Sequence, residues 1–129
     1  MMSRSLLPAF LLAAFPAAAD PALECNTGTA SQVEIGECVA EAEARVDAAV
    51  EAALGFAMAA ATDLDEITGR EVAVPALEAS QAAWAAYRDA QCEFVGASFG
   101  GGSGTGIAIR ACRVELGRVR AAELLRYAQ

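Results

Sequence analysis

The stretch QAAWAAYRDAQC, residues 81–92, decides the fold. It holds the only Trp of the chain, one of its two Tyr, an Arg, an Asp and a Cys, and its five Ala and two Gln favour a helix. On a helical wheel of ~100° per residue, Arg88 and both Gln residues fall on the same face as Trp84, whereas Asp89 points the other way. The stretch is therefore interpreted as a helix with a polar inner face rather than as an active site.

Two further segments, one on each side of this stretch, show a 3.6-residue apolar period, and almost nothing in the chain alternates with period two. The first segment begins at SQVE, where Ser31 and Glu34 fit a capping box, and should continue to about Ala61. The helix around Trp84 should span residues 75–95, and the last helix residues 107–127. We expect an all-α fold: a small antiparallel three-helix bundle, with room for a short extra helix between the first and second.

The Gly-rich segment GASFGGGSGTG, residues 96–106, connects the second and third predicted helices. A phosphate-binding loop would need a Lys and a preceding strand, and neither is present. We interpret the segment as a flexible bend. In the third helix, Val119 and Tyr127 fall on the predicted inner face, whereas Val114 and Leu125 fall off it and should be exposed.

An inward Arg88 is costly unless a carboxylate or several carbonyls receive it. The wheel places Asp47 and Glu43 beside the apolar face of the first helix as candidate partners. It also places Arg120 and Glu123 on the inner face of the third helix. We predict a semi-buried layer that sets the register of the helices, with a binding pocket as the alternative. Its members are Asp47, Gln81, Trp84, Arg88, Arg120 and Glu123.

The chain has four Cys residues and no His, which bears on its disulfides and on any metal site. An even count in a small exported domain indicates two disulfides, and four Cys allow three connectivities. The layout of the helices favours Cys25–Cys38 and Cys92–Cys112. Without a CxxC pair or a His, we expect neither a metal nor a cofactor.

The N-terminal residues 1–19 have the pattern of a secretory signal peptide. Arg4 precedes an apolar run, and Ala17-Ala18-Ala19 forms a small-residue cleavage site. We expect one domain, residues 20–129, in the periplasm or secreted. Glu24 before Cys25 argues against a lipid anchor, and no later segment resembles a membrane span.

The mature chain would be strongly acidic. It has 8 Arg and 17 acids once Arg4 is removed, so its net charge is 8 − 17 = −9. Such a chain is not expected to bind nucleic acid or anionic lipid, but it could attract a cationic partner. Glu34, Glu37 and Glu41 form a candidate partner-binding stripe, which could equally be an ordinary solvated helix face.

Catalysis has little support in the sequence. Nucleophiles of the Ser-His and Cys-His kinds are excluded by the absence of His, and oxidised Cys residues cannot supply a thiolate. We therefore expect a protein that is not an enzyme.

The motif Q-x-x-W-x-x-Y-R-D-x-x-C, followed by a Gly-Gly-Ser bend and a fourth Cys, resembles the N-terminal domain of LprI-type lysozyme inhibitors. The chain departs from the family pattern at Val50-Glu51 (often Leu-Asn), at Ala53 or Leu54 (usually Tyr) and at Gly117 (commonly Thr). The resemblance implies a candidate inhibitor that binds a cationic lysozyme-like protein. The alternative is an envelope module that binds a protein or small molecule without inhibiting lysozyme. Oligomeric state stays open. Further elements that carry the resemblance are Cys25, Ser31, Glu34, Cys38, Asp47, Gly101, Gly102, Ser103, Cys112, Arg120, Glu123 and Leu124.

Overall fold

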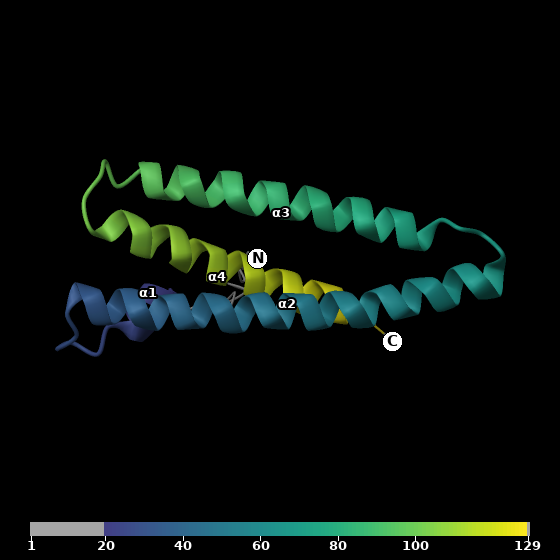
Figure 1. Cartoon of the computed structure of the whole chain (residues 1–129), viewed down its shortest axis with the longest axis horizontal. Helices are drawn as coiled ribbons and strands as arrows, with labels where there is room; N and C mark the ends of the chain where they lie inside the picture. The colour runs from purple at the N-terminus through teal and green to yellow at the C-terminus, as the bar shows by residue number, and fades with distance from the viewer. Residues whose placement is uncertain (1–19, 129) are drawn as a thin grey trace, which may run out of the picture.

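The computed structural model describes residues 20–128, so the predicted signal peptide, residues 1–19, lies outside the described part. The helices are α1 (Pro21–Cys25), α2 (Gln32–Thr68), α3 (Ala73–Ala97) and α4 (Gly104–Leu125), and no strand occurs among the described residues. Figure 1 shows α2 and α3 as a long hairpin, with α4 returning antiparallel to α3 and lying along α2. The short α1 packs against α2 and α4. The predicted all-α bundle of three long helices is confirmed, but the short extra helix precedes the first long helix rather than following it.

The N-terminus of α2 begins at the predicted capping box. The Ser31 backbone N–H donates to Glu34 Oε2 at 2.7 Å, and the Glu34 N–H donates to Ser31 Oγ at 3.3 Å. These hydrogen bonds satisfy backbone donors that the first turn of a helix leaves unpaired. They also lower the pKa of Glu34 from its ordinary value.

The C-terminal end of α2 lies seven residues beyond the predicted end at Ala61, because TDLDEIT stays helical up to Thr68. Thr and Asp lower helix propensity only modestly, whereas Gly69, in the left-handed conformation at φ 64°, provides a true stop. The hydroxyls of Thr62 and Thr68 donate to carbonyls one turn earlier, at 2.9 and 2.8 Å, so neither side chain breaks the helix.

Asp65 links the end of α2 to the start of α3. Its Oδ1 accepts the N–H groups of Val72 and Ala73 at 3.2 and 2.8 Å, and its Oδ2 accepts the N–H of Val74 at 3.0 Å. The carboxylate thus caps α3 from a neighbouring helix. These backbone donors hold the pKa of Asp65 below its ordinary value.

Replacing Asp65 with Asn should weaken the protein at neutral pH and flatten its acid denaturation. A lowered folded-state pKa gives stability that is present above the unfolded pKa, about 4, and is lost as the pH falls through the folded pKa. Urea unfolding between pH 2 and pH 7, followed by circular dichroism, measures the effect. Asp63→Asn, which removes the same charge two residues earlier, is the matched control. Parallel pH curves for wild type and Asp65→Asn would contradict the capping role.

The core has two apolar clusters along α2. One gathers Cys25, Ile35, Val39 and Ala111 near α1. The other gathers Val50, Ala53, Ala57 and Leu124 further along, with Trp84 and Leu77 packed against it. The three long helices therefore share a thin, Ala-rich core.

The prediction for the inner face of α4 was wrong in two respects. Val114 is fully buried rather than exposed, while Val119 is 63% and Tyr127 66% exposed rather than buried. The exposure of Leu125, at 49%, is confirmed, as is the burial of Cys112, which the wheel also places on the inner face. The buried face of α4 includes Gly117, which a wheel does not count as apolar and which lies against Val46 of α2. Tyr127 lies beyond the end of α4 at Leu125.

Candidate functional site

The predicted polar layer lies where α2, α3 and α4 meet. Arg88 Nη2 donates to Asp47 Oδ1 at 2.7 Å, and Arg88 Nε donates to the Arg113 carbonyl at 3.2 Å. The Arg88 side chain is 13% exposed, whereas the Asp47 side chain is 50% exposed. One guanidinium from α3 therefore ties a carboxylate of α2 to the backbone of α4.

The second half of the layer is centred on Arg120, which is buried. Its guanidinium donates to Gln81 Oε1 at 3.0 Å, Ser80 Oγ at 3.1 Å and Glu123 Oε2 at 2.8 Å. Both guanidiniums lie near Trp84, with the Cζ atoms of Arg88 and Arg120 at 5.3 and 5.9 Å from its ring centroid. These distances suit cation–π contacts.

The structure brings all six predicted members of the layer together. Both Arg side chains are paired, so the layer exposes no uncompensated charge to a substrate. Its geometry fits a role in holding three helices in register. The predicted members are Asp47, Gln81, Trp84, Arg88, Arg120 and Glu123.

Replacing Arg88 with Met should lower the free energy of unfolding by about 1–2 kcal/mol. The loss stays below that of a fully buried pair because Asp47, at 50% side-chain exposure, can be rehydrated. Arg45→Met is the control, since Arg45 is 69% exposed and forms only an i,i+4 pair with Glu41 at 3.6 Å. Urea unfolding measures both variants. Equal stability of the Arg88 variant and wild type would show that the layer does not set the register.

A second charged cluster was not anticipated. Glu43 is only 9% exposed and accepts from Arg110 Nη1 at 2.7 Å and Arg113 Nη1 at 3.5 Å. The sequence offered Glu43 as an alternative partner of Arg88, but it pairs with α4 instead. Asp89, which the helical wheel turned away from the Trp84 face, is exposed but lies 3.8 Å from Arg113 Nη2. The spacing of Arg110 and Arg113, one turn apart, was the only signal for this cluster.

Disulfides and an ion pair hold the end of the bundle at which α2 and α4 begin and α3 ends. Disulfides join Cys25 to Cys38 and Cys92 to Cys112, which confirms the predicted connectivity. Arg118 donates to both carboxylate oxygens of Glu24 at 2.8 Å, which lowers the pKa of Glu24 and raises that of Arg118. The bidentate pair anchors α1 on α4.

The predicted acidic stripe is exposed but partly engaged within α2. Glu34 serves the capping box, and Glu41 lies 3.6 Å from Arg45 Nη1. Glu37 is exposed. Much of the charge of the stripe is thus used locally, which weakens it as a site.

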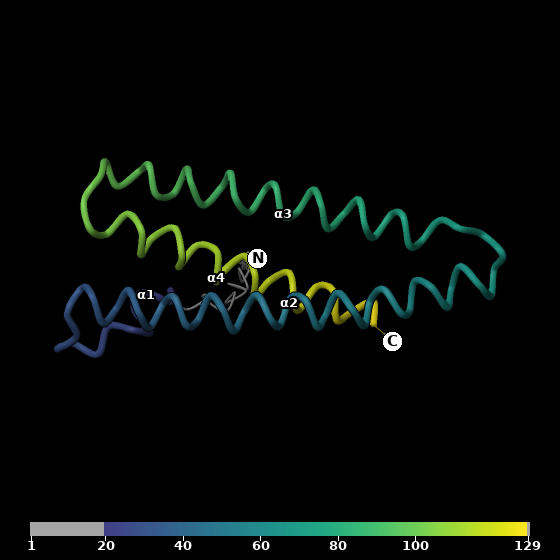
Figure 2. The backbone as a smooth tube through the Cα atoms, in the orientation of Figure 1, coloured from purple at the N-terminus to yellow at the C-terminus, as the bar shows by residue number. Residues whose placement is uncertain are grey.

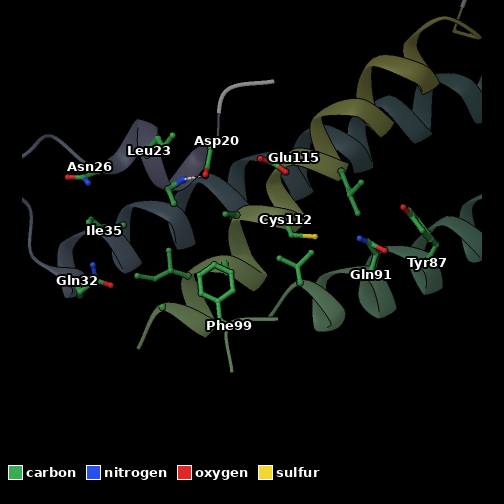
Figure 3. Close-up of a pocket in the computed structure, with 17 residues that line it drawn as sticks. Asp20, Leu23, Asn26, Gln32, Ile35, Tyr87, Gln91, Phe99, Cys112 and Glu115 are labelled. Atoms are coloured by element: carbon green, nitrogen blue, oxygen red, sulfur yellow. Dashed lines mark hydrogen bonds between the residues drawn. The ribbon is translucent and has the colours of Figure 1, made fainter. Parts of the chain in front are cut away.

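A pocket of about 460 Å³ lies between α1, the start of α2, α3 and α4. Figure 3 shows Asp20 and Glu115 on one side of it, with Gln91 and Tyr87 from α3 on the other. Burial and the neighbouring Asp20 carboxylate raise the pKa of Glu115. The pocket could accept a small ligand with apolar and basic parts. Within residues 20–128, no group of three or more His, Cys, Asp or Glu side chains is placed to hold a metal ion.

Comparison with known proteins shows the family. A family model described as lysozyme inhibitor LprI matches residues 23–124. The chain belongs to the lysozyme inhibitor LprI family. The matched range includes both disulfides and every member of the polar layer, and the resemblance expected from the Trp84 motif is confirmed.

Relatives of this LprI-family chain add little about function. An uncharacterized protein of Rhizobium meliloti (strain 1021) is 35% identical over 112 residues, covering 83% of this chain and 80% of that protein. No solved structure matches the chain. Over residues 20–128, every helix is either too short or too polar to cross a lipid bilayer.

Proposed function

We propose that this LprI-family chain is an exported, non-enzymatic protein that binds a lysozyme and inhibits it. The observation that carries the proposal is the match to the lysozyme inhibitor family over residues 23–124. The signal-peptide pattern of residues 1–19 supports export to the periplasm or beyond. The absence of His from the sequence and the pairing of all four Cys support binding rather than catalysis.

Charge supports a cationic partner. With residues 1–19 removed, the chain carries 8 Arg and 17 acids, so its net charge is 8 − 17 = −9. The first part of the mature chain, residues 20–78, is the more acidic, with 2 Arg and 13 acids, a net of −11. A field of this sign speeds encounter with a positively charged enzyme and is screened by salt.

A cell-wall clearing assay tests inhibition. The full chain is produced with its own N-terminus and purified from the periplasm, and it is added to a c-type lysozyme at low and moderate salt. We expect slower clearing at micromolar protein, binding heat in calorimetry, and weaker binding as the salt rises. Normal clearing and no binding heat at either salt would end the proposal for that enzyme.

Processing is tested on the same preparation. Intact-mass measurement should give a chain that begins at Asp20. A chain that keeps residues 1–19, or that stays in the cytoplasm, would contradict export by a cleaved signal peptide.

A second candidate function is binding of a small molecule in the pocket of Figure 3 without lysozyme inhibition. The observation that favours it is the placement of the Asp20 and Glu115 carboxylates beside an apolar lining that includes Ile107 and Leu116. A ligand screen by thermal shift separates the two functions. Stabilisation by a basic apolar ligand that is lost in Glu115→Gln, together with normal clearing, would favour the second.

A further inference from the structure

The far end of the bundle contains a groove that no helix of the described chain fills. At 1.5 Å rise per residue, the 37-residue α2 is about 55 Å long and the 22-residue α4 about 33 Å. Figure 2 shows α2 and α3 continuing beyond the end of α4 to the turn that joins them. Between their outer halves lies a space of about 890 Å³, closed at its inner end by Leu124 and by the Arg120–Glu123 pair.

Small side chains line the walls of this groove, and large apolar side chains surround its mouth. Ala57, Ala60 and Ala61 of α2 face Ala73 and Ala76 of α3, so side chains of one methyl group leave the space open. Large apolar side chains surround the opening instead of filling it. A gathering of such side chains at one end of a soluble protein marks a surface for interaction more often than scattered exposure does. The exposed fractions are 61% for Phe56, 53% for Leu64, 84% for Ile67 and 66% for Tyr127.

The charge around the groove indicates what kind of partner fits. Residues 56–80 contain one Arg and five acids, a net of 1 − 5 = −4. Asp63 lines the groove itself, and Glu66 is the neighbour of Ile67 in the sequence. A second copy of the chain would bring an equally negative surface to the same place, which disfavours self-association. A cationic partner meets no such repulsion.

We infer that this groove, rather than the Glu34–Glu41 stripe, receives the partner, and that it binds apolar side chains flanked by Lys or Arg. The inference rests on the proposed function in identifying that partner as a cationic lysozyme. Burial of Leu64 and Ile67 supplies the contact energy, and the acids at the rim orient the partner and speed its approach. The groove thereby combines an apolar surface with carboxylates at its edge, whereas the stripe has carboxylates alone.

Three double variants separate the two surfaces. Leu64→Ser with Ile67→Ser removes two of the four large apolar side chains at the mouth. Asp63→Asn with Glu66→Gln removes one charge that lines the groove and one that lies next to Ile67 in the sequence. Glu37→Gln with Glu41→Gln removes two charges from the stripe and is the matched control. All six side chains are exposed, so the fold should be retained, which circular dichroism checks. Calorimetry should show a Kd for lysozyme raised about tenfold by each groove variant and less than about threefold by the control.

A second probe keeps this inference separate from lysozyme inhibition. A synthetic amphipathic helix of Leu and Lys should bind the wild-type groove, and its Leu and Glu counterpart should not. If lysozyme is not bound but the Leu/Lys peptide binds and loses affinity in the groove variants, the inhibitor function fails and the groove assignment stands. If lysozyme binds wild type and groove variants alike, the groove assignment is overturned and the inhibitor function stands. Failure of both ligands overturns both. A dimer in light scattering that dissociates in Leu64→Ser with Ile67→Ser would also overturn the inference, because a second copy would then occupy the groove.

Discussion

Replacing both Cys92 and Cys112 with Ala is expected to lower the free energy of unfolding by about 3 kcal/mol, because a cross-link over 20 residues restricts the unfolded chain. For a domain of this size the melting temperature should fall by roughly 10–15 °C. Both sulfurs are buried, so the variant also loses packing in the core.

The position of this disulfide makes its effect global. It joins the end of α3 to the start of α4 across a bend in which Gly100, Gly101 and Gly102 all have positive φ. Glycine segments order at a high entropy cost, so the bend contributes little to holding the two helices together. Thermal unfolding by circular dichroism, with and without reductant, measures the loss. A variant with the same melting temperature as the oxidised wild type would contradict this account.

The cross-link between Cys25 and Cys38 is the natural comparison. It spans 13 residues and holds only the five-residue α1. Its removal should release α1 while the three long helices keep most of their stability. Amide hydrogen exchange would show faster exchange confined to residues near α1.

Gly117→Val is expected to be about as damaging, with a loss of about 3 kcal/mol from overpacking. A Cβ built at Gly117 collides with Val46 Cγ1 and also approaches Arg88 Nη2 at 3.7 Å. Val46 has two methyl groups on its Cβ and few rotamers with which to move aside. The substitution would therefore push α4 away from α2 at the level of the polar layer.

Two variants show whether the collision is the cause. Val46→Ala in the Gly117→Val background should restore most of the lost stability, since it removes the methyl group that a new Cβ meets. Gly55→Val is the matched control, because a Cβ at the exposed Gly55 of α2 meets nothing within 4 Å. Urea unfolding of wild type, Gly117→Val, Val46→Ala and the double variant gives the coupling energy. Additive effects of the Gly117 and Val46 substitutions would show that close helix approach is not what Gly117 provides.

Gly117 also clarifies one departure from the family pattern. The family resemblance led us to expect Thr at this position, and a Cβ on any residue there would meet Val46 Cγ1. In this chain the approach of α2 to α4 depends on a glycine. The polar layer spans all three long helices, since Arg88 binds Asp47 of α2 and Arg120 of α4 binds Gln81 of α3.

The sequence predicted the polar layer of the candidate site, but neither the partners of Glu43 nor the groove. Arg88 and Arg120 could be placed inward because an Arg on an apolar face needs a partner, and Asp47 was one of two choices. Glu43 could not be assigned, because its partners Arg110 and Arg113 lie 67 and 70 residues away on a helix whose rotation was not known. The groove at the far end was also invisible, since it depends on the unequal lengths of α2 and α4.

The sequence by itself determined the approximate positions of the three long helices, the capping box at Ser31, the presence of two disulfides and the family resemblance. These features depend on residues within a turn or two of each other, or on side chains with few possible partners. The tertiary structure alone decided the rotation of α4 that buries Val114 and exposes Val119, and the open groove. The physical reason is that these features arise where one helix meets another, and the fit of Gly117 against Val46 has no signature in either helix taken alone.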